Sequence, residues 1–106
     1  MTVVEKFSVR YADDGTTYTL SCHGPIDASA TEAMRAATLH ALSSRCEVIV
    51  VDLSGVTLVD SAGVTSMLLA HKAAEIAGVE LRFVGARKPV VRVLRLAGGE
   101  QLVGSA

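Results

Sequence analysis

The stretch from Val48 to Gly63 places the strongest constraint on the fold of this chain. It begins with Val48-Ile49-Val50-Val51, a short run of β-branched residues typical of a strand covered on both faces. It ends with Asp60-Ser61, directly before a segment rich in alanine, leucine and methionine that predicts a helix over residues 61–77. Aspartate and serine side chains accept hydrogen bonds from the free N–H groups of a first helical turn. The sequence therefore predicts a buried strand that carries a serine to the start of a helix.

The segment before this stretch predicts a β-hairpin followed by a helix. Apolar and polar residues alternate over residues 7–11 and 18–22, as in half-buried strands, and Asp13-Asp14-Gly15 between them is a turn signal. Ser29-Ala30-Thr31-Glu32 has the spacing of a capping box, which predicts a helix that starts near Ser29. We expect this helix to end near residues 43–45, just before the central strand.

The segment after the 61–77 helix predicts another strand over residues 79–84. A strand, a helix and a strand in this order imply a parallel pair joined by a right-handed crossover. Lys88-Pro89-Val90 places proline at the start of a last helix, which Gly98-Gly99 ends, and we expect the tail over residues 100–106 to be weakly ordered. The predicted fold class is therefore α/β, with a mixed, mostly parallel β-sheet, an N-terminal β-hairpin and amphipathic helices packed against the sheet.

Length, charge and cysteine usage narrow the class of protein. The 106 residues fit a single domain spanning 1–106, and half of them are hydrophobic, enough for a core without a metal or disulfide. A net charge of −1 argues against nucleic-acid binding. Cys22 and Cys46 lack metal-site spacing, and we expect two reduced core thiols. Without a signal peptide or a membrane-spanning run, we expect a soluble cytoplasmic domain.

Catalytic motifs are not found in the sequence. The segment Val59-Asp60-Ser61-Ala62-Gly63 lacks the first glycine of a hydrolase nucleophile elbow, and no histidine has a recognisable relation to Ser61. The histidines at 23, 40 and 71 are too far apart to suggest a metal site, and no phosphate-binding glycine loop occurs. We therefore expect a protein that is not an enzyme and that binds no metal or cofactor.

Ser61 has two interpretations, a helix cap or an exposed functional hydroxyl. Asp60 alone can cap the helix, which would leave the hydroxyl of Ser61 free at the surface. A projection at about 100° per residue places Val64 and Leu68 on the side of Ser61. It places Leu69, Ala73 and Ile76 on the opposite side, toward the sheet. An exposed pair of apolar side chains beside a free serine predicts a docking patch for a partner.

Three segments together resemble the STAS domain family (sulfate transporter and anti-sigma factor antagonist). Residues 52–64, from Asp52-Leu53-Ser54-Gly55 to Asp60-Ser61-Ala62-Gly63-Val64, resemble the family signature. Gly24-Pro25-Ile26-Asp27 resembles the turn before its first helix, and Leu94-Arg95-Leu96-Ala97-Gly98 resembles its late helix. The resemblance implies the STAS fold and a bacterial role in partner switching. In such systems an antagonist binds an anti-sigma factor and thereby releases a sigma factor.

The resemblance also implies a phosphorylation switch. The anti-sigma factor is a serine kinase in these systems, and the motif match makes Ser61 the phosphorylated residue, with a PP2C-type phosphatase expected to reverse the modification. The partner-binding residues implied with it are Asp27, Asp60, Ser61, Ala62, Gly63, Val64 and Leu68. Ala62 departs from the well-known antagonists, which often carry another hydroxyl there. An alternative is an accessory subunit of an ABC-type (lipid) transporter, which binds its ATPase without a phosphorylation cycle.

Overall fold

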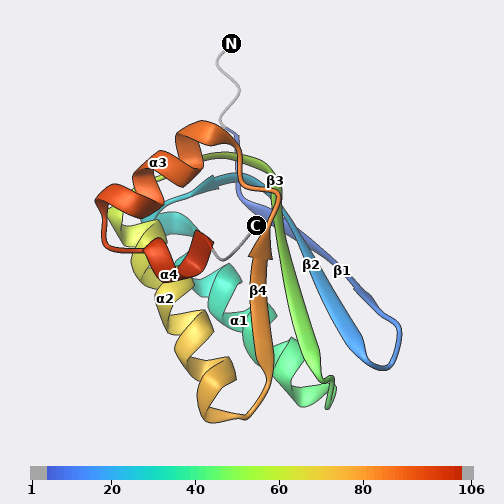
Figure 1. Ribbon diagram of the computed structural model, residues 1–106. Coiled ribbons are helices and arrows are strands. Elements are labelled where there is room, and N and C mark those ends of the chain that lie inside the picture. The colour runs from blue at the N-terminus through green and yellow to red at the C-terminus, as the bar shows by residue number, and fades with distance from the viewer. Residues whose placement is uncertain (1–4, 104–106) are drawn as a thin grey trace.

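A computed structural model describes residues 5–103, which form a four-stranded sheet with helices on one face (Figure 1). The elements are β1 (Ser8–Asp13), β2 (Thr17–Ile26), the 3-10 turn η1 (Ala28–Ala30), α1 (Thr31–Ser43), β3 (Val48–Val59), α2 (Ser61–Ile76), β4 (Glu80–Val84), α3 (Lys88–Leu96) and α4 (Glu100–Val103). The strand order is β1-β2-β3-β4, with β1 antiparallel to β2 and the other pairs parallel. This arrangement confirms the predicted fold class.

The predicted hairpin is confirmed, and its turn is closed by two aspartates. Asp13 accepts a hydrogen bond from the N–H of Gly15 at 2.8 Å, and Asp14 accepts from the N–H groups of Thr16 and Thr17. Gly15 has a φ of +94°, a conformation that glycine adopts without strain. Along β2 every second residue is buried, whereas β1 is mostly exposed because it lies at the edge of the sheet.

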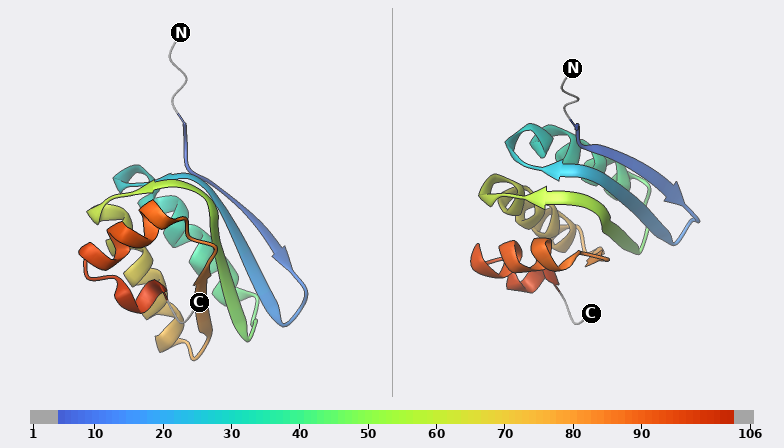
Figure 2. Two further views of the ribbon diagram at one scale, coloured as in Figure 1. Left: turned by 45° about the horizontal axis from the view of Figure 1, so that its top comes forward. Right: turned by 90° about the horizontal axis from the view of Figure 1, so that it is seen from above.

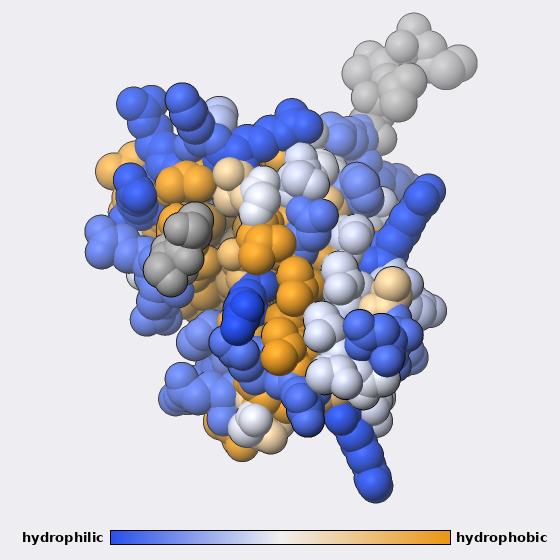
Figure 3. Space-filling view, turned by 45° about the vertical axis from the view of Figure 1, so that its right-hand side comes forward, coloured by the Kyte–Doolittle hydropathy of each residue, from blue (hydrophilic) through white to orange (hydrophobic). Residues whose placement is uncertain are grey.

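The expectation that β3 is covered on both faces is wrong. Ile49, Val51 and Leu53 are buried under the helices, but Val48 and Val50 point to the other face and are only half-buried. The two views of Figure 2 show no helix on that side of the sheet. Figure 3 shows an apolar strip there, flanked by polar side chains. Val48 and Val50 pair with Thr17 and Thr19 of β2, which supply neighbouring polar side chains.

The first long helix begins differently from the capping-box prediction. Asp27, not Ser29, caps the chain here, and it caps the short turn η1, after which α1 starts at Thr31. The predicted end is confirmed, because α1 ends at Ser43 and Arg45 has a φ of +62°. The cap therefore lies two residues earlier than the capping box predicted, and the 3-10 turn η1 separates it from α1.

The predicted rotation of α2 is wrong. Val64 is 2% exposed and Leu68 is half-buried, whereas Leu69 is 61% and Ile76 is 77% exposed. Met67 and Ala70 are the α2 residues buried against the core with Val64 and Ala74. The docking patch formed by Val64 and Leu68 is therefore overturned.

The predicted rotation of α2 is wrong because a second layer, formed by the α3–α4 turn and α4, covers this helix. A helical projection that considers the sheet alone does not include this layer. The turn between α3 and α4 lies over Val64, so that a Cβ added at Gly99 would be 3.2 Å from Val64 Cγ1. Helix α2 packs on α1 and on the sheet and also contacts α4. Apolar residues are therefore needed on three sides of α2, which leaves only a narrow stripe for solvent.

The C-terminal tail begins with a helix, contrary to the prediction of weak order. Helix α4 covers residues 100–103, and Leu102 is only 2% exposed in the core. Residues 104–106 of the predicted tail lie outside the described residues. A single buried leucine thus anchors a segment whose composition looks polar.

Both cysteines are free and buried, which agrees with the prediction of reduced core thiols. Burial raises the pKa of the Cys22 thiol to about 12. At neutral pH this thiol stays protonated, and a protonated thiol is a poor nucleophile.

The observed rotation of α2 predicts opposite outcomes for two neighbouring substitutions. Leu69→Lys should change the free energy of unfolding by no more than about 0.5 kcal/mol, because Leu69 is exposed. Met67→Lys should abolish folding, because it places an unpaired charge at a fully buried position. Urea unfolding followed by circular dichroism measures both. Loss of the fold in Leu69→Lys with a stable Met67→Lys would contradict the observed rotation.

Candidate functional site

The candidate site lies where the parallel strands β2 and β3 end and their helices begin. Ile26 and Val59 pair at the ends of these strands, and the Asp60 N–H donates to the Ile26 carbonyl at 3.3 Å. Asp27 follows Ile26, and Asp60-Ser61 follows Val59. The strand pairing therefore brings the two aspartates and the serine to one end of the sheet.

Asp60 caps α2, and this leaves the hydroxyl of Ser61 unused in the cap. The Asp60 side chain accepts from the N–H of Gly63 at 2.8 Å, and the Asp60 carbonyl accepts from the N–H of Val64 at 2.9 Å. Ser61 is the first residue of the helix and is exposed. No hydrogen bond of the Ser61 hydroxyl occurs among residues 5–103. The interpretation of Ser61 as an exposed hydroxyl thus agrees with the geometry.

Gly63 allows the start of α2 to approach β2 closely. A Cβ added at this glycine would overlap the Ile26 carbonyl oxygen. Gly63 is also buried, unlike Ser61 two residues before it. Gly63 therefore sets the position of Ser61 relative to the sheet and is not itself available to a partner.

Asp27 has the matching role at the end of β2. Its carboxylate accepts from the Ser29 N–H at 2.9 Å and from the Ser29 hydroxyl at 2.5 Å. These bonds, the hydroxyl first, hold the pKa of the Asp27 carboxyl below its usual value. The ionised carboxylate therefore adds to the free energy of unfolding at neutral pH. This stabilisation is lost as the pH falls through the lowered pKa. Asp27 is half-buried and acts mainly as a helix cap.

The residues predicted from the sequence divide into two groups. Asp27, Asp60, Ser61 and Ala62 lie together at the end of the sheet and are at least partly accessible. Gly63 and Val64 are buried, and Leu68 packs against the core.

The exposed residues that follow Ser61 along α2 form a stripe that the sequence analysis missed. This outer stripe consists of Ser61, Thr65, Leu69, Lys72 and Ile76. Thr65 and Leu69 follow Ser61 at intervals of four residues, which places them on neighbouring turns of one helix face. The missed signal was Leu94 and Leu102, which belong to the same buried core as Val64, and Leu68 packs against that core.

An apolar groove between α1 and α2 adjoins the outer stripe. It has a volume of about 90 Å³, and Leu39 and Leu69 line it with Ala70 and Ala73. Leu39 is 50% exposed. The groove places Leu69 beside a second exposed leucine on the accessible side of α2.

The part of the chain that the structure describes contains neither a candidate metal site nor a candidate membrane span. Within residues 5–103, His, Cys, Asp and Glu side chains do not gather in any group of three or more that could hold a metal ion. No helix in the same range is long and apolar enough to cross a membrane.

The cap geometry predicts different roles for Asp60 and Ser61 in stability. Asp60→Ala should lower the free energy of unfolding by about 1 kcal/mol, because the Gly63 N–H loses its acceptor. Ser61→Ala is the matched control and should stay within about 0.5 kcal/mol of the wild type. Chemical denaturation of the two variants decides the point. An equal loss in Ser61→Ala would mean that the serine, and not the aspartate, holds the helix start.

Comparison with known proteins identifies the family and shows where the fold recurs. The family described as "Mlab, STAS domain" matches residues 9–104. An anti-sigma factor antagonist from Mycobacterium paratuberculosis is 19% identical, with a TM-score of 0.78, and the match covers 91% of this chain and 81% of that one. The anti-sigma factor antagonist SpoIIAA in its unphosphorylated form is 18% identical, with a TM-score of 0.74 and coverage of 90% and 84%.

One further neighbour of the fold is described differently, and SpoIIAA also matches in its phosphorylated form. A sulfate transporter family protein from Wolinella succinogenes is 16% identical, with a TM-score of 0.73 and coverage of 90% and 76%. SpoIIAA of Bacillus in its phosphorylated form matches with 18% identity, a TM-score of 0.68 and coverage of 90% and 87%. No curated protein matches the sequence. At these identities the solved structures share the fold, and the family match extends over nearly the whole chain. The chain belongs to the STAS domain family.

Proposed function

We propose that this STAS domain is an anti-sigma factor antagonist that is switched off by phosphorylation of Ser61. It binds an anti-sigma factor, which is also a serine kinase, and so releases a sigma factor. The observation that carries the proposal is that Asp60 caps α2 while the neighbouring Ser61 stays exposed. The similarity in fold to two anti-sigma factor antagonists supports it. The domain acts by binding and not by catalysis.

Phosphorylation of Ser61 is chemically compatible with the fold. The Ser61 hydroxyl oxygen attacks the γ-phosphorus of ATP in the kinase, the bond to the bridging oxygen breaks, ADP leaves and a base of the kinase takes the proton. The product adds about −1.5 to −2 charges at the start of a helix. The positive end of the helix dipole favours negative charge there. A PP2C-type phosphatase then restores the hydroxyl.

The partner docks on the part of the outer stripe from Ser61 to Leu69, in place of the patch first predicted from Val64 and Leu68. Ser61, Thr65 and Leu69 are exposed on neighbouring turns, and the α1–α2 groove beside them adds Leu39. Asp27, Asp60 and Ala62 border the same end of the helix. A partner packed on this surface meets a small neutral hydroxyl before phosphorylation and a strongly hydrated dianion after it.

Ser61→Ala should abolish phosphorylation while leaving the fold intact. Intact mass after incubation with ATP and the kinase-type anti-sigma factors of the same organism should show one added phosphate on the wild type and none on the variant. Ser54 and Thr57, which are also exposed, are the competing acceptors. Full labelling of Ser61→Ala, mapped to either of them, would refute the assignment.

Two substitutions should weaken binding of the anti-sigma factor without unfolding the domain. Ser61→Asp copies part of the phosphate charge, and Leu69→Lys places a charge on the docking surface. The matched control is Ile76→Lys, which is also exposed but lies fifteen residues after Ser61, or about 22 Å along the helix. Calorimetry should give roughly a tenfold or larger loss of affinity for the first two, or about 1.4 kcal/mol, and little change for the control. Unchanged affinity in Leu69→Lys, or a larger loss in Ile76→Lys, would place the interface elsewhere.

A second candidate is an accessory subunit of an ABC-type (lipid) transporter that binds its ATPase. The similarity to a sulfate transporter family protein favours a role of this class. In that case no phosphorylation cycle is needed, and Ser61→Asp binds the partner as tightly as the wild type does. The genes beside this one also separate the candidates, because a kinase-like anti-sigma gene supports the first and an ABC operon the second.

A further inference from the structure

The outer edge of β4 has no strand partner among residues 5–103. β4 pairs with β3 alone. The Glu80 N–H donates at 3.2 Å to the carbonyl of Glu47, the residue just before β3. Consecutive residues of a strand turn their peptide groups to opposite edges, so Leu81 presents its N–H and C=O outward. An unpaired edge of this kind is a template for another strand.

The approach to this edge is open beside its first residues. A groove of about 710 Å³ runs along β4 and is lined by Leu81 and Phe83 together with residues of α4 such as Leu102. Figure 1 shows α4 beside the carboxyl-terminal half of β4, away from the start of this strand. Leu81 and Phe83 are each 8% exposed, the most exposed members of the core. A strand added at this edge would cover both.

The charges of β4 are complementary to a second copy of β4. Glu80 and Arg82 lie on the uncovered face, where their side chains form an ion pair of 2.9 Å and remain half or more exposed. In an antiparallel pair of two β4 strands centred on Leu81, Glu80 of each copy lies opposite Arg82 of the other. Opposite charges directly across an antiparallel pair are stabilising, whereas like charges are destabilising.

We propose that the outer edge of β4 is an interface for a second copy of this chain, with the two strands antiparallel and centred on Leu81. Centring on Arg82 instead places two arginines opposite each other. Pairing two β1 strands about Arg10 also places like charges together, since Arg10 shares its face with Ser8 and Ala12. In the pair centred on Leu81, each glutamate lies opposite an arginine of the other copy. This charge complementarity favours the β4 edge over the β1 edge and the Leu81 register over the Arg82 register.

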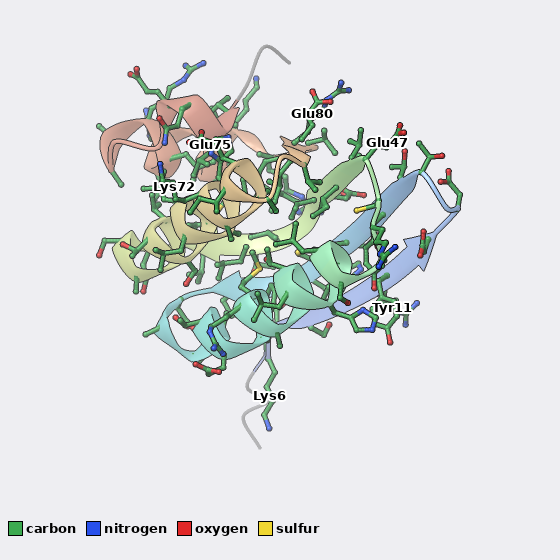
Figure 4. The ribbon with its side chains drawn as sticks, turned by 90° about the horizontal axis from the view of Figure 1, so that it is seen from below. Lys6, Tyr11, Glu47, Lys72, Glu75 and Glu80 are labelled. Atoms are coloured by element: carbon green, nitrogen blue, oxygen red, sulfur yellow. The ribbon has the colours of Figure 1, made fainter. Side chains whose placement is uncertain are left out.

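This interface leaves the phosphorylation site accessible. Glu80 lies at the start of β4, level with Val48 at the start of β3, whereas Ser61 follows the far end of β3. Figure 4 shows Glu80 at the outer edge of the molecule, with Lys72 and Glu75 on α2 separate from it. A pair of copies therefore joins two sheets into one and presents two Ser61 sites.

Sedimentation velocity of the full chain over a range of concentrations tests the proposal. A short strand edge buries less than a standard interface, so the dimer should be weak and should form as the concentration rises to roughly 1 mM. Glu80→Arg makes the four charges all positive and Arg82→Glu makes them all negative, so each variant alone should stay monomeric. An equimolar mixture of the two should dimerise again, because one copy then carries only positive and the other only negative charges.

The matched controls reverse another exposed ion pair, Lys72–Glu75 on α2, whose atoms are 3.2 Å apart. Lys72→Glu and Glu75→Arg should dimerise as the wild type does. Circular dichroism should show all four variants folded, since the substituted side chains are exposed. A wild type that stays monomeric at every concentration overturns the proposal. So do single β4 variants that dimerise normally, or a mixture that fails to associate.

Discussion

The close approach of α2 to the end of β2 is the contact on which the rest of the structure depends. The Ile26 carbonyl accepts the N–H of Asp60, and Gly63 lies so close to the same carbonyl that no side chain fits between them. Asp60 then caps the helix by accepting from the Gly63 N–H. These bonds fix where α2 starts, and therefore fix both the helix layer and the place of Ser61.

Local patterns predicted the elements well because they depend on short-range chemistry. The run of β-branched residues predicted β3, and the carboxylate of Asp60 predicted the start of α2. Of the two interpretations of Ser61, the structure agrees with the exposed hydroxyl, which followed from the ability of Asp60 to cap the helix alone. The fold class followed from the order of these elements.

The rotation of α2 could not be predicted from the same patterns because three surfaces compete for it. α1, the sheet and the α3–α4 turn all pack on this helix, and its sixteen residues are too apolar overall for one stripe to stand out. Val64 is covered by a turn that lies over thirty residues later in the chain. For the same reason, the sequence did not predict α4. The burial of Leu102 in the core depends on distant parts of the chain. The uncovered face of the sheet could not be predicted either. The run that contains Val48 and Val50 has the pattern of a strand buried on both faces, and only the packing of the helices shows that one face is open.

The separation of the cap from the exposed serine explains how a modification can change binding and leave the fold unchanged. The side chain of Asp60 holds the helix, and the hydroxyl of Ser61 contributes nothing to that hydrogen bond. A phosphate on Ser61 therefore removes no hydrogen bond that keeps α2 in place, and the helix dipole offsets part of its repulsion by the Asp60 carboxylate. A partner that packs on Ser61 must remove water from whatever that residue carries. Removing it from a hydroxyl costs little, but removing it from a dianion costs much more. In the proposed switch, the free-energy cost of phosphorylation therefore falls on the interface and not on the fold.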